Sequence, residues 1–95
     1  VMVGGLWDGF QAKLTAAFRE AGIPVQPPRE GLEGIHPENI CNRGLTGAGG
    51  QLEISEGLRR RLRKDEETLF QFVEIVRGGL LELEAEAMKG RSRVP

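Results

Sequence analysis

The chain has 95 residues, of which 39% are hydrophobic and 28% charged, and its formal net charge is −1. A chain of this length forms one small domain or a part of a larger one. A charge balance so close to neutral does not indicate nucleic-acid binding. No apolar run approaches the ~20 residues of a membrane span, and the first residues do not resemble a secretory signal. We therefore expect no membrane or nucleic-acid partner, and a cytoplasmic location or release by cell lysis.

The sequence contains one cysteine, Cys41, and one histidine, His36. One cysteine excludes an internal disulfide and a zinc knuckle built from several thiolates. One histidine excludes a catalytic metal site that takes two or three histidines from this chain alone. If Cys41 is a nucleophile, it needs a base, and His36 is the only histidine near it in the sequence. A single cysteine more commonly serves as a small, buried, apolar residue. The sequence assigns no role to His36.

Residues 1–3, followed by two glycines, predict a short strand that turns into a helix. Apolar residues at helical spacing from Leu6 to Ala21 predict an amphipathic helix, with Gly22 as its C-terminal cap. Residues 23–26 are interpreted as a second strand, which lies at a sheet edge because Pro24 has no N–H. Strand, helix and strand at this spacing predict a right-handed parallel βαβ unit.

Residues 27–50 are rich in proline and glycine and predict a long loop, a length that is usually functional. Residues 51–55 alternate polar and apolar side chains, which predicts a third strand with Gln51, Glu53 and Ser55 on one face. Beyond Gly57 the chain is predicted to be helical, with an apolar stripe over residues 69–87 and a frayed end at 91–95. The glycine pair at 78–79 indicates a kink or a close backbone approach.

The predicted fold class is therefore α/β: a small layered unit with a short, mostly parallel sheet, made of the βαβ unit plus the third strand, and a C-terminal helix. We divide the chain into residues 1–62, which hold the sheet, and residues 63–95, which form the amphipathic helix and tail. So thin a sheet leaves strand edges exposed, which natural proteins usually cover.

Residues 39–59 read NICNRGLTGAGGQLEISEGLR. This segment resembles the C-terminal part of the poly-γ-glutamate hydrolases, a family of phage-associated zinc hydrolases similar to carboxypeptidases. Members carry an Asn-Ile-Cys/Val-Asn-Arg-Gly element, a glycine-rich turn and then Gln-Leu-Glu-(Leu/Ile)-Ser-Arg-Gly-Leu-Arg, and the resemblance extends over residues 1–62. Two positions depart from it: Gly50 stands where the family usually has Val, and Glu56 where it usually has Arg. The family's zinc ligands lie upstream of the matched segment, so none is assigned here.

The resemblance implies roles for four residues. Glu53 corresponds to the strand glutamate that acts as general base toward the metal-bound water; the alternative is a solvent-facing glutamate on an edge strand. Arg43, with Asn42 beside it, is a candidate clamp for substrate carboxylates, because a guanidinium matches a carboxylate in shape; the alternative is a simple turn. Arg59 is carried over as a third substrate-binding residue. It begins a basic run to Lys64 that suits either an anionic polymer or a solvated helix face.

The resemblance thus implies a portion of a zinc-dependent amidohydrolase that cleaves the γ-glutamyl amide bonds of poly-γ-glutamate. Zinc is the cofactor of the intact family, and this chain alone holds none, so we expect it to be inactive without an upstream half of the domain. The alternative is a non-catalytic α/β interaction module that forms a homodimer through an exposed sheet edge.

Overall fold

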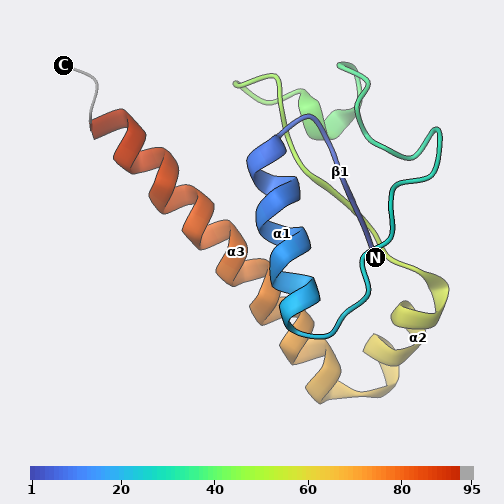
Figure 1. The fold of residues 1–95 in the computed structure, drawn as a ribbon. Helices are drawn as coiled ribbons and strands as arrows, with labels where there is room; N and C mark the ends of the chain where they lie inside the picture. The colour runs from blue at the N-terminus through green and yellow to red at the C-terminus, as the bar shows by residue number, and fades with distance from the viewer. Residues whose placement is uncertain (93–95) are drawn as a thin grey trace.

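The computed structural model describes residues 1–92, and their side chains through Lys89. Within this range the elements follow one another as β1 (Met2–Gly4), α1 (Asp8–Glu20), the 3₁₀ turn η1 (Ile40–Asn42), β2 (Gln51–Glu53), α2 (Glu56–Lys64) and α3 (Glu66–Ser92). Figure 1 shows α3 packed along α1 and extending past it, while β1 and the long loop lie on the other side of α1 in this view. Of the predicted frayed end, Arg91 and Ser92 continue α3, and residues 93–95 lie outside the described range.

The predicted three-stranded, mostly parallel sheet is wrong. The described residues form a two-stranded antiparallel sheet in a mainly helical unit. In its register Met2 lies opposite Glu53, Val3 opposite Leu52 and Gly4 opposite Gln51. The third predicted strand is therefore present, but it pairs with the first one directly and runs in the opposite direction.

The direction of β2 follows from where the long loop ends. The side-chain oxygen of Asn42 accepts hydrogen bonds from the backbone N–H groups of Leu6, at 3.1 Å, and Gly49, at 3.0 Å. The backbone N–H of Trp7 also donates to the carbonyl of Gly49, at 3.0 Å. These bonds fix Gly49 beside the residues that follow β1. Because β2 begins where β1 ends, it can only return along β1 in the antiparallel direction.

Residues 23–26 lie beside Val1 but do not form the second strand that the sequence predicts. The terminal amino group of Val1 donates to the carbonyl of Pro24 at 3.1 Å, and the N–H of Gln26 donates to the carbonyl of Val1 at 3.0 Å. Both bonds involve Val1, and Pro24 has no N–H to extend them into a ladder. The segment is therefore extended chain without strand pairing.

One hydrophobic core joins α1, β1 and α3. Its buried members are Val1, Val3, Phe10, Leu14, Phe18, Phe72 and Leu83. Phe18 stacks on Phe72 with ring centroids 5.4 Å apart. A Cβ atom on Gly79 would lie 3.1 Å from Cδ2 of Leu14, so the glycine leaves room for this side chain where α3 packs against α1. Residues beyond 62 therefore share the core of the first 62 residues, and position 62 itself lies within α2.

Helix α2 begins at a residue that capping rules favour, whereas α1 follows Trp7, whose side chain makes no cap hydrogen bond. Ser55 caps α2, and its hydroxyl accepts a hydrogen bond from the N–H of Leu58 at 3.2 Å.

Ion pairs join α1 to α3. The ammonium group of Lys13 pairs with the carboxylates of Glu82, at 3.2 Å, and Glu86, at 2.8 Å. None of the helices within residues 1–92 has the combination of length and apolar character that a membrane span requires.

Asp65 precedes α3 and caps it. Its carboxylate accepts from the hydroxyl of Thr68 at 2.8 Å and from the backbone N–H groups of Thr68, at 3.4 Å, and Glu67, at 3.1 Å. These bonds, the Thr68 hydroxyl first, hold the pKa of Asp65 below its ordinary value of 3.8. A lowered folded-state pKa means that the stabilisation is complete above the ordinary value and is lost as the pH falls through the lowered one.

We therefore expect Asp65→Ala to lower the urea midpoint of unfolding at about pH 7, and to have a smaller effect at about pH 2, because the stabilisation declines as the pH falls below the ordinary value and through the lowered pKa. Far-UV circular dichroism during urea titration measures this. Asp65→Asn is the control, because its amide oxygen still caps the helix without titrating. An effect of Asp65→Ala that is equally large at both pH values contradicts this account.

Candidate functional site

Glu53, the predicted general base, is the last residue of β2 and lines a pocket. Its strand neighbour Leu52 packs against the core, so the pleat turns Glu53 to the opposite face of the sheet. There it lines a cavity of about 380 Å³ together with Gln26, Arg29, Ser55, Glu56, Arg59 and their neighbours. We call this cavity the Glu53 pocket. It joins four parts of the chain: the N-terminal residues at the start of β1, the extended segment after α1, the end of β2 and the first turn of α2.

Charged side chains surround the Glu53 pocket. Arg29 comes from the long loop and Arg59 from the first turn of α2. Within the described part of the chain neither arginine forms an ion pair. Glu56, by contrast, pairs with Arg60 at 2.6 Å, which offsets its charge. The pocket therefore combines one carboxylate on the sheet with two guanidinium groups that can receive an anion.

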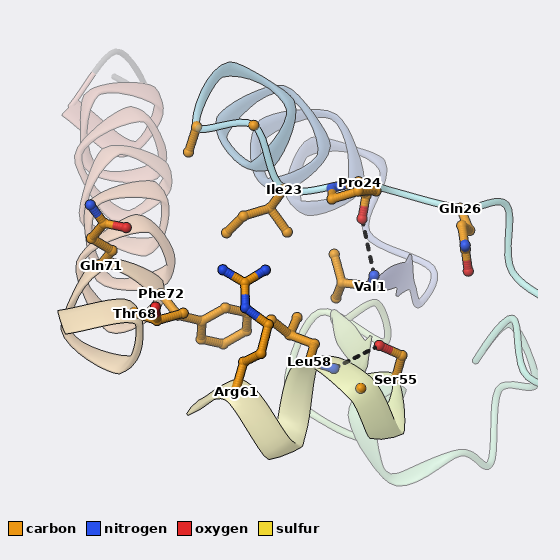
Figure 2. A pocket seen from close by; sticks show the side chains of 13 residues that line it. Val1, Ile23, Pro24, Gln26, Ser55, Leu58, Arg61, Thr68, Gln71 and Phe72 are labelled. Atoms are coloured by element: carbon orange, nitrogen blue, oxygen red, sulfur yellow. Dashed lines mark hydrogen bonds between the residues drawn. The ribbon is translucent and has the colours of Figure 1, made fainter. Parts of the chain in front are cut away.

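A second cavity, of about 400 Å³, adjoins the Glu53 pocket, and the two share Val1, Gln26 and Ser55 in their walls. Figure 2 shows the Arg61 side chain reaching from α2 into this cavity toward Ile23, with Thr68, Gln71 and Phe72 of α3 around it. We call it the Arg61 pocket. In the sequence Arg61 is one member of the basic run, and the fold of α2 brings its side chain to this cavity.

Asn42 lies outside both pockets and is buried, with 2% of its surface exposed. Besides accepting from Leu6 and Gly49, its amide nitrogen donates to the carbonyls of Gly34, at 2.6 Å, and His36, at 3.0 Å. An asparagine side chain has two donor hydrogens and an acceptor oxygen with two lone pairs. Backbone groups of this chain occupy all four of these hydrogen-bonding positions, and Asn42 is therefore the residue that organises the loop.

Arg43 is exposed at the end of η1 and lines neither the Glu53 pocket nor the Arg61 pocket. Of the residues predicted to bind or transform substrate, the structure thus brings Glu53 and Arg59 together and leaves Asn42 and Arg43 elsewhere. Arg29 and Arg61 were missed. The path of the loop that carries Arg29 depends on long-range contacts, such as the bond from the N–H of Gly5 to the carbonyl of Glu33 at 2.8 Å. No local pattern indicates such contacts.

A family model for poly-gamma-glutamate hydrolase matches residues 1–72. The chain belongs to the poly-γ-glutamate hydrolase family. No curated protein and no solved structure matches it. The matched residues extend from β1 into α3 and include every residue that lines the Glu53 pocket and the Arg61 pocket.

The described residues do not fit the zinc ion that the family resemblance implies. Within them, no three His, Cys, Asp or Glu side chains are grouped so that they could hold a metal ion. The Nδ1 atom of His36 accepts from the N–H of Glu38 at 3.0 Å, and the Cys41 thiol lies 3.7 Å from the carbonyl of Gly34. Neither side chain is part of a ligand set, and these contacts do not form a thiol–imidazole pair.

The two departures from the family pattern have local explanations. A Cβ atom on Gly50, where the hydrolases usually have Val, would overlap the ring of Phe10. In this chain the ring of Phe10 therefore occupies the space that a valine side chain at position 50 would need. Glu56 stands in place of the usual Arg at the first position of α2, where a negative charge favours the helix N-terminus.

Proposed function

We propose that this chain supplies the substrate-facing part of a hydrolase site for γ-linked polyglutamate, with Glu53 as general base and Arg59 and Arg29 as anchors for substrate carboxylates. The observation that carries this proposal is the Glu53 pocket itself. Glu53 shares this pocket with two arginines that have no ion-pair partner within residues 1–89. Poly-γ-glutamate carries one free α-carboxylate per unit, and a guanidinium binds a carboxylate through paired hydrogen bonds.

The chemistry assigned to Glu53 is proton transfer. Its carboxylate takes a proton from the water that attacks the γ-amide carbon and passes it to the departing amide nitrogen as the C–N bond breaks. Arg59 and Arg29 orient the chain so that this carbon faces Glu53. Zinc, which the resemblance implies, needs ligands other than the described residues, so we propose that this chain alone binds the polymer without cleaving it.

The adjoining Arg61 pocket extends the proposed binding surface. The two cavities adjoin and share three wall residues, and we propose that a polymer bound in one extends over the other. Successive carboxylates of the polymer would then meet Arg59 and Arg61 on the same helix. Substrate binding by Arg43 stays a prediction, as do the carboxypeptidase-like chemistry, the phage association and the cytoplasmic location. We assign Asn42 to the support of the loop.

Binding of a γ-linked glutamate oligomer, measured by isothermal titration calorimetry on the chain alone, tests the proposal. We expect Arg59→Gln and Arg29→Gln each to weaken binding roughly tenfold, the effect of losing one charge-assisted hydrogen bond. Arg63→Gln is the matched control, because Arg63 is exposed on the same helix as Arg59 and lines neither pocket. Equal affinities for the Arg59 and Arg63 variants contradict the proposal.

A further inference from the structure

Helix α3 exposes an apolar stripe that α1 does not cover. Its members recur at spacings that place them on one face of the helix. They are Phe70, Val73, Leu80, Leu81 and Met88, and all are exposed, Phe70 to 65% and Met88 to 60%. A groove of about 370 Å³ runs along this face beside Leu52 of β2. A continuous, exposed apolar surface of this kind on a folded protein indicates an interaction site.

Two opposite charges lie within the α3 stripe. Arg77 and Glu84 both line the groove. They are seven positions apart, about two helical turns, so they point to the same side of α3. Among the described residues neither forms an ion pair. The midpoint between them falls between Leu80 and Leu81, so the stripe carries a positive charge on one side of its centre and a negative charge on the other.

This arrangement is complementary to itself. We propose that a second copy of the chain docks on the α3 stripe, with the two α3 helices antiparallel and the two-fold axis passing between Leu80 and Leu81. Antiparallel pairing about this axis places Arg77 opposite the partner's Glu84 and, by symmetry, Glu84 opposite the partner's Arg77. It also places Val73 opposite the partner's Met88. A parallel pair would instead oppose like charges at both positions, which disfavours it.

The proposed dimer differs from the sheet-edge dimer that the sequence suggested, and it is independent of the hydrolase assignment. None of the residues that line the Glu53 pocket lies on α3. Dimerisation through α3 therefore leaves that pocket open to substrate. The two α3 helices then cover each other's apolar side chains, while α1 continues to cover Phe72 and Leu83 in the core of each copy.

Charge reversal tests this pairing. Sedimentation equilibrium should show the wild-type chain as a dimer. Arg77→Glu and Glu84→Arg should each weaken self-association roughly tenfold or more, because each variant opposes like charges twice. An equimolar mixture of the two variants should form a one-to-one heterodimer, because every opposed pair then has opposite charges. The double variant, Arg77→Glu with Glu84→Arg, should self-associate like the wild type.

Arg63→Glu in α2 is the control and should leave the dimer intact, and circular dichroism checks that each variant is folded. A wild-type chain that sediments as a monomer at every concentration overturns the proposal and indicates that another polypeptide covers the stripe. A dimer that neither charge reversal weakens also overturns it, because its interface then lies elsewhere, for example at the sheet edge. Two variants that do not associate when mixed exclude the antiparallel register.

Discussion

Replacing Asn42 with aspartate should lower the free energy of unfolding by about 4 kcal/mol. The carbonyls of Gly34 and His36 both lose their donor, and each buried unsatisfied group costs about 1–3 kcal/mol. The new carboxylate is also buried, and it faces carbonyl oxygens instead of a cation. Folding stability of small domains is about 5–15 kcal/mol, so this one change removes much of it. Urea titration followed by circular dichroism measures the loss.

Asn39→Asp is the matched control for Asn42→Asp. Asn39 lies in the same motif, and its side-chain oxygen accepts from the N–H of Cys41 at 3.1 Å, a bond that a carboxylate keeps; it loses only the long bond, at 3.4 Å, from its amide nitrogen to Oε1 of Gln51. We expect this variant to lose less than about 1 kcal/mol. If the two aspartate variants are equally stable, Asn42 does not organise the loop, and the explanation of the antiparallel sheet fails with it.

Replacing Glu53 with glutamine should separate binding from catalysis. Glutamine keeps the size of the side chain but cannot take a proton from water, so hydrolysis should fall by about 10²–10⁴-fold. The same change removes a negative charge from a pocket that receives an anionic polymer. Affinity for a γ-linked glutamate oligomer should therefore stay the same or increase. Calorimetry measures the affinity, and release of glutamate measures hydrolysis once the metal-holding part of a poly-γ-glutamate hydrolase is supplied in trans.

Glu56→Gln is the control for the catalytic prediction, because Glu56 is a second carboxylate in the same pocket and is paired with Arg60. We expect it to retain most of the activity. Hydrolysis that survives Glu53→Gln shows that another group acts as base. Full activity in the presence of a chelator contradicts the zinc dependence that the family resemblance implies.

Local patterns predicted the helices and the face of β2 that carries Glu53. Helical spacing from Leu6 to Ala21 corresponds to α1, and the alternation that begins at Gln51 turned Glu53 away from the core. The direction of the sheet was not predictable in this way. It depends on the side-chain oxygen of Asn42, which accepts from the N–H of Leu6, 36 positions away, as well as from the N–H of Gly49, and the type of a single polar residue in a loop does not reveal its partners.

The same limit applies to the candidate site. Family resemblance drew attention to Glu53 and Arg59, which do line one pocket. It also suggested Asn42 and Arg43 as a carboxylate clamp, yet the amide of Asn42 is fully occupied by backbone groups. Arg29 was missed because it lies in an irregular, proline-rich segment, where neither periodicity nor motif spacing indicates which surface a side chain reaches.

The central claim is that the Glu53 pocket binds the γ-glutamyl chain, and a nuclear magnetic resonance titration tests it most directly. The ¹⁵N-labelled chain is titrated with a γ-linked glutamate oligomer while the backbone amide signals are followed. We predict that the largest shifts occur at Glu53, Ser55, Arg59 and Arg29, with smaller ones at Arg61. Shifts confined to residues outside both pockets, or no shifts at all, would contradict the assignment of this pocket to the substrate.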